Sequence, residues 1–209
     1  MKRLNELLAD VRALDIRGSV AREISALEYD SRKVEADNCF FAVVGTASDG
    51  HNYIPMAVER GAKAIVCQRL PESLSDDVAY IVVEDTNEAM AMMAAAYYDH
   101  PSEELRLVGV TGTNGKTTTA TLLYDMTMAM GYRAGLISTV VYRIGEERIA
   151  STHTTPDAIR LNAMMRRMVD SGCDYCFMEV SSHSIVQHRI DGLKFTGGLF
   201  THRTRDHRD

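Results

Sequence analysis

The sequence predicts an α/β protein made of two consecutive domains, residues 1–100 and 101–209, the second built on a parallel sheet. Three observations lead to this fold class. Short apolar runs alternate with segments of helical character along the chain. Pro101, followed by a polar stretch, interrupts the alternation near the middle. In the second half, a glycine-rich loop joins a strand-like run to a helix.

Residues 1–100 are expected to form a small α/β domain. Strands are predicted where apolar residues run together, at residues 39–44, 64–67 and 80–83. A helix is predicted at residues 53–60, ending at Gly61, because glycine readily adopts the left-handed conformation that closes a helix. An alanine- and methionine-rich helix follows at residues 88–98 and ends before Pro101.

Residues 101–209 are expected to form a parallel sheet with helices on both faces, because strands and helices alternate regularly. The predicted strands cover residues 105–110, 134–141, 175–180 and 198–201. The predicted helices, at residues 117–130 and 158–171, are each followed by a glycine, Gly131 and Gly172. The apolar face of the first helix is assigned to Leu122, Leu123, Met126 and Met130.

Composition and charge argue against several classes of protein. Hydrophobic residues make up 45% of the chain and charged residues 25%, which are ordinary values for a folded protein. The net charge of −6 argues against a nucleic-acid partner, which selects a basic surface. The first residues lack the apolar core of a signal peptide, and the most apolar stretch, residues 89–98, is too short to span a bilayer. Four cysteines in a chain of this length do not indicate a disulfide framework, so we expect a cytoplasmic protein without membrane association.

The glycine-rich loop has the composition of a phosphate-binding loop. It consists of Gly112, Thr113, Asn114, Gly115, Lys116, Thr117 and Thr118. Glycines let backbone N–H groups converge on an anion, and the start of the following helix adds favourable partial charge. Lys116 would reach the β- and γ-phosphates of a nucleotide, and the Thr117 hydroxyl would reach Mg²⁺. Val110 stands where the strict pattern has its first glycine, which weakens a generic kinase or GTPase interpretation.

A second polar cluster follows the strand predicted at residues 175–180. Glu179 ends that strand and is followed by Ser181, Ser182 and His183. The carboxyl ends of strands in open α/β sheets face the ligand crevice, so Glu179 could hold a magnesium ion there. The spacing supports equally well a helix-capping region in which Glu179 is merely solvated.

Several motifs occur in a characteristic order along the chain. They are Tyr29 to Arg32, Phe40 to Gly45, Asp49 to His51, Thr111 to Thr118, Thr154 to Asp157, Met178 to His183 and Gln187 to Arg189. In this order they resemble the motifs of the Mur ligase family of bacterial cell-wall synthesis. The resemblance covers nearly the whole chain and is strongest to the members that add a diamino acid to UDP-N-acetylmuramoyl-L-alanyl-D-glutamate.

The resemblance implies roles for both domains and for individual residues. Residues 1–100 would be a uridine-binding domain, and residues 101–209 the N-terminal part of a P-loop ATP-binding domain. The UDP end of the substrate would contact Tyr29, Ser31, Thr46, Ala47 and Ser48. The sugar, diphosphate or peptide portion would contact His153, Thr154, Thr155, Ser181, Gln187 and Arg189. The catalytic residues would be Lys116, Glu179 and His207, with Thr117, Glu179 and His207 serving Mg²⁺.

The reaction implied by the resemblance is ATP-dependent amide-bond formation in peptidoglycan precursor synthesis. The γ-phosphoryl group of ATP would pass to a substrate carboxylate, and the amine of meso-diaminopimelate or L-lysine would then displace phosphate. The family pattern continues past residue 209 into a domain that binds the amino acid, so the 209 residues alone are expected to bind and not to ligate.

The last residues depart from the family pattern. Arg203 and Arg208 stand where relatives usually have leucine, and His202 stands where they have asparagine. A buried arginine is costly unless its charge is paired or reaches water. We therefore expect this tail not to pack as it does in relatives.

Three alternatives remain at this stage. A folylpolyglutamate-type ligase shares the loop but should lack a uridine-binding domain ahead of it. A GTPase switch or another non-enzymatic nucleotide-binding module should carry a guanine-reading Asn-Lys-x-Asp motif, and the sequence has none. A metal or redox protein could be built on Cys173 and Cys176, but this pair has no second pair at finger spacing.

Overall fold

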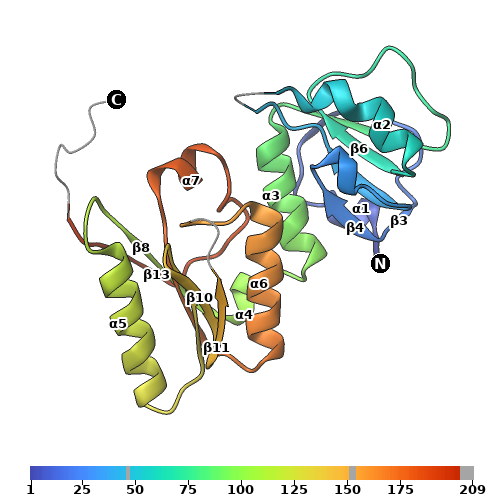
Figure 1. The fold of residues 1–209 in the computed structure, drawn as a ribbon. Coiled ribbons are helices and arrows are strands. Elements are labelled where there is room, and N and C mark those ends of the chain that lie inside the picture. Colours follow the sequence, from blue (N-terminus) through green and yellow to red (C-terminus); the bar gives the residue numbers. More distant parts are fainter. Residues whose placement is uncertain (46–47, 151–153, 203–209) are drawn as a thin grey trace. The chain divides into compact units, whose positions relative to one another are not determined.

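The computed structural model describes residues 1–45, 48–150 and 154–202 (Figure 1). Contacts within the chain divide it into two compact units, Met1–Tyr97 and Tyr98–Asp209. Each unit has its own sheet and its own core, and each is described by itself.

Unit 1 is built on a five-stranded sheet with strand order β2-β7-β6-β5-β4. The strands are β2 (Ala13–Arg17), β4 (Ala26–Glu28), β5 (Asn38–Phe41), β6 (Ala64–Cys67) and β7 (Ala79–Val83). The four strands β4 to β7 pair in parallel, and β2 joins the edge antiparallel to β7. A separate two-stranded ladder pairs β1 (Lys2–Arg3) with β3 (Glu23–Ile24).

Each helix of unit 1 follows one of its strands along the chain. They are α1 (Leu4–Leu7), α2 (Ile54–Glu59) and α3 (Thr86–Tyr97), with 3-10 turns η1 (Ser31–Lys33) and η2 (Gly50–Tyr53). Small side chains let α3 pack closely, because Ala91, Ala94 and Ala95 are all buried. In the described part of the chain, no helix is long and apolar enough to cross a membrane.

Unit 2 contains a six-stranded sheet with strand order β11-β10-β9-β12-β8-β13. Four strands pair in parallel, namely β8 (Arg106–Thr111), β9 (Ala134–Ile137), β12 (Tyr175–Glu179) and β13 (Gly197–Phe200). At one edge the sheet is completed by an antiparallel hairpin of β10 (Val141–Ile144) and β11 (Glu147–Ala150). The helices are α4 (Pro101–Glu104), α5 (Lys116–Ala129), α6 (Ala158–Asp170) and α7 (Ser182–Val186).

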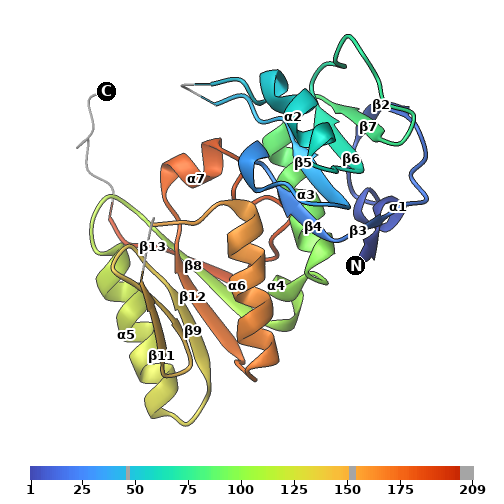
Figure 2. The same ribbon diagram turned by 45° about the vertical axis from the view of Figure 1, so that its right-hand side comes forward.

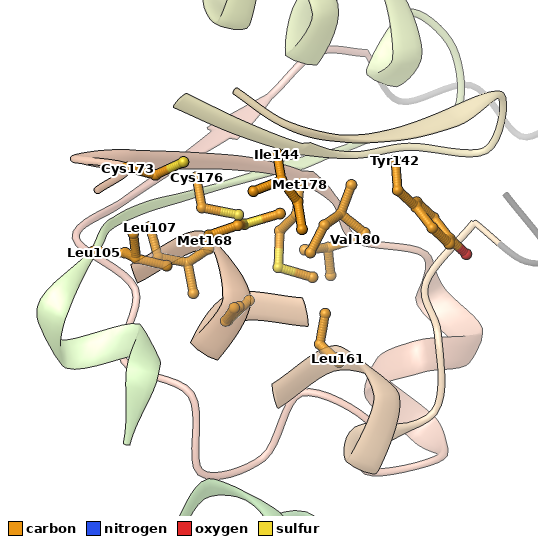
Figure 3. Close-up of a cluster of buried hydrophobic side chains, with 12 residues drawn as sticks. Leu105, Leu107, Tyr142, Ile144, Leu161, Met168, Cys173, Cys176, Met178 and Val180 are labelled. Carbon is orange, nitrogen blue, oxygen red and sulfur yellow. The ribbon is translucent and has the colours of Figure 1, made fainter. Parts of the chain in front are cut away.

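The two long helices of unit 2 cover opposite faces of its sheet (Figures 1 and 2). Successive side chains of a strand point to opposite faces. Along β12, Phe177 accordingly joins the cluster that contains Tyr124 of α5, whereas Cys176 and Met178 join the cluster that contains Leu161 of α6. Figure 3 shows this second cluster between the strands and α6. The predicted α/β fold class is thus confirmed.

The first correction to the predicted elements concerns the strand expected at residues 134–141. The chain leaves β9 after Ile137 and returns antiparallel as β10, so the sheet is mixed rather than purely parallel. The Ser138 hydroxyl donates to the Val141 carbonyl at 2.8 Å and lies 3.2 Å from the Val141 N–H. These local hydrogen bonds stabilise a tight turn inside a run that reads as continuous strand.

The second correction concerns the apolar face of α5. Ala120 and Tyr124 are the buried residues, whereas Leu122, Met126 and Met130 are 56%, 60% and 70% exposed. Tyr124 determines how the helix is turned, because its ring packs in the core and its hydroxyl donates to the Gly145 carbonyl at 2.5 Å. Of the four predicted residues, only Leu123 is partly buried against this core, so hydrophobicity alone identified one of the four correctly.

The chain around Pro101 also differs from the expectation. Pro101 was expected to stop helix formation, yet it begins the short helix α4. A proline in the first turn of a helix loses nothing, because the N–H that it lacks would have no partner there. The strands before residue 30 were not predicted, since β1 to β4 are short and only partly buried.

Two substitutions test whether Leu122 of α5 lies in the core, with the fully buried Leu107 of β8 as the reference. Leu107→Ala should destabilise the protein by about 2–5 kcal/mol, because it leaves a cavity in a fully buried position. Leu122→Ala should change stability by less than about 0.5 kcal/mol, because the side chain is largely exposed. Denaturant unfolding of both variants measures the difference, and equal losses would place Leu122 in the core.

Candidate functional site

The phosphate-like loop of unit 2 connects the end of β8 to the start of α5. Gly115 caps the helix with φ of 85°, in the left-handed region, and Lys116 is the first helical residue. The Lys116 ammonium donates to the carbonyls of Gly112 at 2.7 Å and Thr113 at 3.2 Å. The loop therefore curls around the lysine, and its helix end presents backbone N–H groups of the kind that bind anions.

Gly112 is the tightest point of this loop. Its φ is 133°, and a Cβ placed there would lie 2.4 Å from the Thr201 hydroxyl oxygen and 2.9 Å from the backbone of His202. Any side chain at this position would push the loop away from the end of β13. Glycine is thus required by the approach of a neighbouring strand as well as by the turn.

Glu179 lies at the end of β12, beside the end of β8. Its side chain is 1% exposed, so the alternative of a merely solvated carboxylate is wrong. One carboxylate oxygen accepts the Thr139 N–H at 2.9 Å, and the other lies 3.2 Å from the Thr139 hydroxyl. Both of these partners are neutral groups, and among the described residues no ion pair to this buried carboxylate is found.

Three further predicted residues gather around Glu179. The Thr154 hydroxyl lies 3.1 Å from that of Thr139. The Thr155 hydroxyl donates to the Glu179 carbonyl at 3.0 Å, and Arg189 donates to the Thr155 carbonyl at 2.7 Å. The structure therefore brings Thr154, Thr155 and Arg189 together at the carboxyl end of β12.

Thr139 was missed from the sequence, although it is the residue that holds the Glu179 carboxylate. The only available signal was its place just after a strand-like run, at the sheet edge where ligands bind in such folds. The expectation of one strand at residues 134–141 hid that signal, because it placed Thr139 inside the strand.

Ser181 and Gln187 lie at the two ends of α7. The Ser181 side chain accepts the Ser184 N–H at 3.1 Å and so caps the helix. Gln187 follows the last helical residue and is exposed. Their predicted contacts with substrate stay predictions.

A hollow of about 590 Å³ in unit 1 is lined by the predicted Tyr29, Ser31 and Ser48. Tyr29 is 41% exposed, and Ser31 is nearly buried. Asp30 and Arg32 also line the hollow, and Arg32 donates to both carboxylate oxygens of Asp30, at 2.9 and 2.8 Å. This hydrogen bonding by Arg32 lowers the pKa of Asp30 to about 2.

Gly50, the middle residue of the Asp49–His51 motif, lines the same hollow. Asp49 accepts the His51 backbone N–H at 2.9 Å and the ring Nδ1–H at 2.6 Å, and it also accepts from Arg69. The hydrogen bond from Arg69, followed by those from His51, lowers the pKa of Asp49. The His51 Nε2 accepts the Gln68 N–H at 2.9 Å, so the ring proton resides on Nδ1.

Gly50 completes this motif through its lack of a side chain. A Cβ there would lie 2.6 Å from the nitrogen and 2.7 Å from the oxygen of Val43, and the Gly50 N–H donates to that oxygen at 2.8 Å. The motif thus joins three backbone segments around one buried imidazole. The sequence pointed to these residues through the resemblance but not to their mutual contacts.

Four of the predicted site residues, Thr46, Ala47, His153 and His207, lie outside the described residues. The same holds for Arg203 and Arg208, so the expectation for the tail stays a prediction. The other predicted residues fall within the two units, with Tyr29, Ser31 and Ser48 in unit 1 and the rest in unit 2.

The four cysteines do not form a reactive centre. All four are buried thiols. Burial raises the pKa of Cys39, Cys173 and Cys176, and raises that of Cys67 to about 11, so little thiolate forms near neutral pH. Within the described residues, no three His, Cys, Asp or Glu side chains are grouped to hold a metal ion. The structure thus gives no support to a site on Cys173 and Cys176.

Comparison with known proteins relates this geometry to a family. The profile of the Mur ligase family catalytic domain matches residues 23–98, and the profile of the Mur ligase middle domain matches residues 110–209. The chain belongs to the Mur ligase family. The first match lies in the segment that a folylpolyglutamate-type ligase was expected to lack.

Curated Mur ligases are similar to this chain over almost its whole length. UDP-N-acetylmuramoyl-L-alanyl-D-glutamate--2,6-diaminopimelate ligase of Phocaeicola vulgatus is 52% identical over 207 residues, and that of Bacteroides fragilis is 53% identical over 207 residues. The matches cover 99% of this chain and 43% of each relative.

A solved structure of a ligase with the same name confirms the Mur ligase fold. It superposes with a TM-score of 0.80 at 23% sequence identity and covers 99% of this chain and 41% of the solved chain. At that identity the likeness concerns the fold alone. The chain spans less than half the length of the Mur ligases that it matches.

The imidazole network around His51 gives a testable prediction. His51→Phe keeps a ring of similar size but leaves the Gln68 N–H without its acceptor and leaves Asp49 Oδ1 with only the backbone N–H of residue 51. We expect unit 1 to lose about 1–3 kcal/mol of stability, the range for a buried polar group left unsatisfied. Denaturant unfolding measures the loss, with hydrogen exchange in β5 assigning it to unit 1. The exposed His183→Phe is the matched control, and an equal effect at both positions would contradict the network.

Proposed function

We propose that this protein is an ATP-dependent ligase that joins diaminopimelate to UDP-N-acetylmuramoyl-L-alanyl-D-glutamate. The observation that carries the proposal is the loop around Lys116 beside the buried Glu179, in a chain 52% identical over 207 residues to a ligase named for that activity. We place the reaction in the cytoplasm, where ATP is available.

The loop is the proposed ATP site. Lys116 would exchange its contacts with the Gly112 and Thr113 carbonyls for contacts with the β- and γ-phosphates. The N–H groups at the start of α5 would neutralise further phosphate charge. Phosphoryl transfer depends mainly on such positioning and charge neutralisation, so no covalent nucleophile is required.

The residues around the loop fit a magnesium ion brought by the nucleotide. Mg²⁺ keeps several waters and binds through one or two carboxylates together with substrate phosphates. Glu179 offers one buried carboxylate that accepts from the neutral groups of Thr139, and Thr117 offers a hydroxyl. When bound, the ion would neutralise charge on the transferred phosphoryl group. Glu179 is held ready for it by the N–H and hydroxyl of Thr139.

The proposed reaction has two steps. A substrate carboxylate oxygen attacks the γ-phosphorus of ATP, and the bond between that phosphorus and the bridging oxygen of the β-phosphate breaks. ADP departs, and the substrate is left as an acyl phosphate. The amine nitrogen of diaminopimelate then attacks the acyl carbon, inorganic phosphate departs, and the nitrogen loses a proton as the amide forms. Lys116 would stabilise the negative charge that develops in the first step.

The hollow in unit 1 is the proposed site for the uridine end of the substrate. Its lining combines the exposed ring of Tyr29 with the hydroxyls of Ser31 and Ser48. An aromatic surface with a few fixed polar groups is the composition that nucleoside-sized ligands require. Thr154, Thr155 and Arg189 in unit 2 would contact the sugar, diphosphate or peptide portion.

Two substitutions separate the two proposed sites. Lys116→Ala should weaken binding of a non-hydrolysable ATP analogue and lower the ligation rate by about 10²–10³, the effect of removing one charge-stabilising group. Ser31→Ala should weaken binding of the UDP-linked substrate by about 0.5–1.5 kcal/mol. Calorimetry should show that each variant keeps normal affinity for the other ligand, and a reversed pattern would exchange the two assignments.

The amino-acid substrate is tested by ADP release. In the product of the gene that encodes this chain, UDP-N-acetylmuramoyl-L-alanyl-D-glutamate and ATP should give rapid ADP release with meso-diaminopimelate. Release with L-lysine should be much slower, because the similar curated ligases are named for diaminopimelate. Preferential stimulation by lysine would overturn the proposed substrate, and the Lys116→Ala variant supplies the background rate.

A further inference from the structure

We infer that Thr201 is a positioning residue for the nucleotide loop, and that it determines which loop N–H groups face a bound phosphate. Thr201 follows β13, about 90 residues beyond the loop in sequence, at the end of the strand predicted at residues 198–201. The inference rests on the proposed ATP site and adds a residue that would act on it without touching the nucleotide.

The end of β13 is fastened to the loop by backbone and side-chain hydrogen bonds. The Thr201 N–H donates to the Thr111 carbonyl at 2.9 Å, which continues the pairing of β13 with β8. The Thr201 hydroxyl lies 2.6 Å from the Asn114 carbonyl oxygen and 3.2 Å from that of Thr111. A hydroxyl has one proton to donate, and the shorter contact assigns it to Asn114. The next residue, His202, accepts the Thr113 N–H at 2.7 Å.

These bonds determine the directions of the loop peptides. In a planar trans peptide the carbonyl of one residue and the N–H of the next point in opposite directions. Because Thr201 holds the Asn114 carbonyl, the Gly115 N–H must point away from Thr201. Because His202 accepts the Thr113 N–H, the Gly112 carbonyl points away from His202, where it accepts the Lys116 ammonium at 2.7 Å.

As a consequence, some loop N–H groups are bonded within the protein and others remain available to a phosphate. The N–H of Thr113 is committed to His202 and is not available to a phosphate. The N–H of Gly115 points away from Thr201 and is available to a phosphate, as are the N–H groups that begin α5. Without the Thr201 hydroxyl, the peptide between Asn114 and Gly115 could rotate and turn its carbonyl dipole toward the anion.

The hydroxyl is not needed for the sheet itself. The Thr201 N–H and the ladder from Gly197 to Phe200 already pair β13 with β8. Asn114 lies outside both strands, so the bond from the Thr201 hydroxyl contributes to the loop and not to the strand pairing. A substitution that keeps the backbone and removes only the hydroxyl therefore isolates the proposed role.

The test compares Thr201→Val, which is nearly isosteric but lacks the hydroxyl, with Thr201→Ser, which retains it. Calorimetry with a non-hydrolysable ATP analogue should show about 2- to 12-fold weaker binding for Thr201→Val, the equivalent of one net hydrogen bond. Thr201→Ser should bind within about twofold of the wild type. Thr196→Val, an exposed position just before the same strand, is the matched control and should leave binding unchanged. Equal affinities for Thr201→Val and Thr196→Val would overturn the inference.

Amide measurements give a readout that general destabilisation would not reproduce. On addition of the ATP analogue, the Gly115 amide resonance should shift while that of Thr113 stays in place, and the Gly115 shift should shrink in Thr201→Val. The opposite pattern in the wild type would overturn the inference.

If the wild type binds no nucleotide, the ATP assignment fails, and exchange in the nucleotide-free chain decides the role of Thr201 separately. Faster hydrogen exchange of the Thr113 amide in Thr201→Val, but not in Thr196→Val, would support the positioning role of Thr201. Unchanged hydrogen exchange in Thr201→Val would exclude that role.

Discussion

The parallel pairing of β8 with β12 is the constraint on which the candidate site depends. The register joins Arg106 to Tyr175 and continues to Val110 opposite Glu179. Parallel strands end at the same edge of a sheet, so this pairing brings the loop after β8 and the carboxylate of β12 to one place. The apolar residues of both strands, packed on α5 and α6, hold that edge in position.

A polar layer is built on this edge from hydrogen bonds between segments distant in sequence. Thr139 holds the carboxylate of Glu179, and Thr155 holds its carbonyl. Arg189 extends the layer, and Thr201 fastens the loop at its other side. Polar groups that are already oriented need not reorganise when a charged ligand binds, which favours binding and phosphoryl transfer alike.

In unit 1, one buried imidazole, that of His51, holds the backbone segments around it. His51 joins the turn after Val43 to the chain that follows β6, and Asp49 accepts from both His51 and Arg69. These bonds hold the backbone of Gly50, which lines the hollow together with Val43. In both units, short polar side chains fix the backbone next to the surface where a ligand would bind.

The sequence by itself determined the features that depend on near neighbours. The strand, loop and helix around Lys116 follow from local composition, as do β6 and the ends of α2, α5 and α6 at glycines. Only the tertiary structure decided the hairpin after β9, the buried side of α5 and the partners of Glu179, His51 and Thr201. The bonds of His51 to Gln68, of Glu179 to Thr139 and of Thr201 to Asn114 join residues from 17 to about 90 positions apart, so their signal lies in the packing of the chain and not in any local pattern.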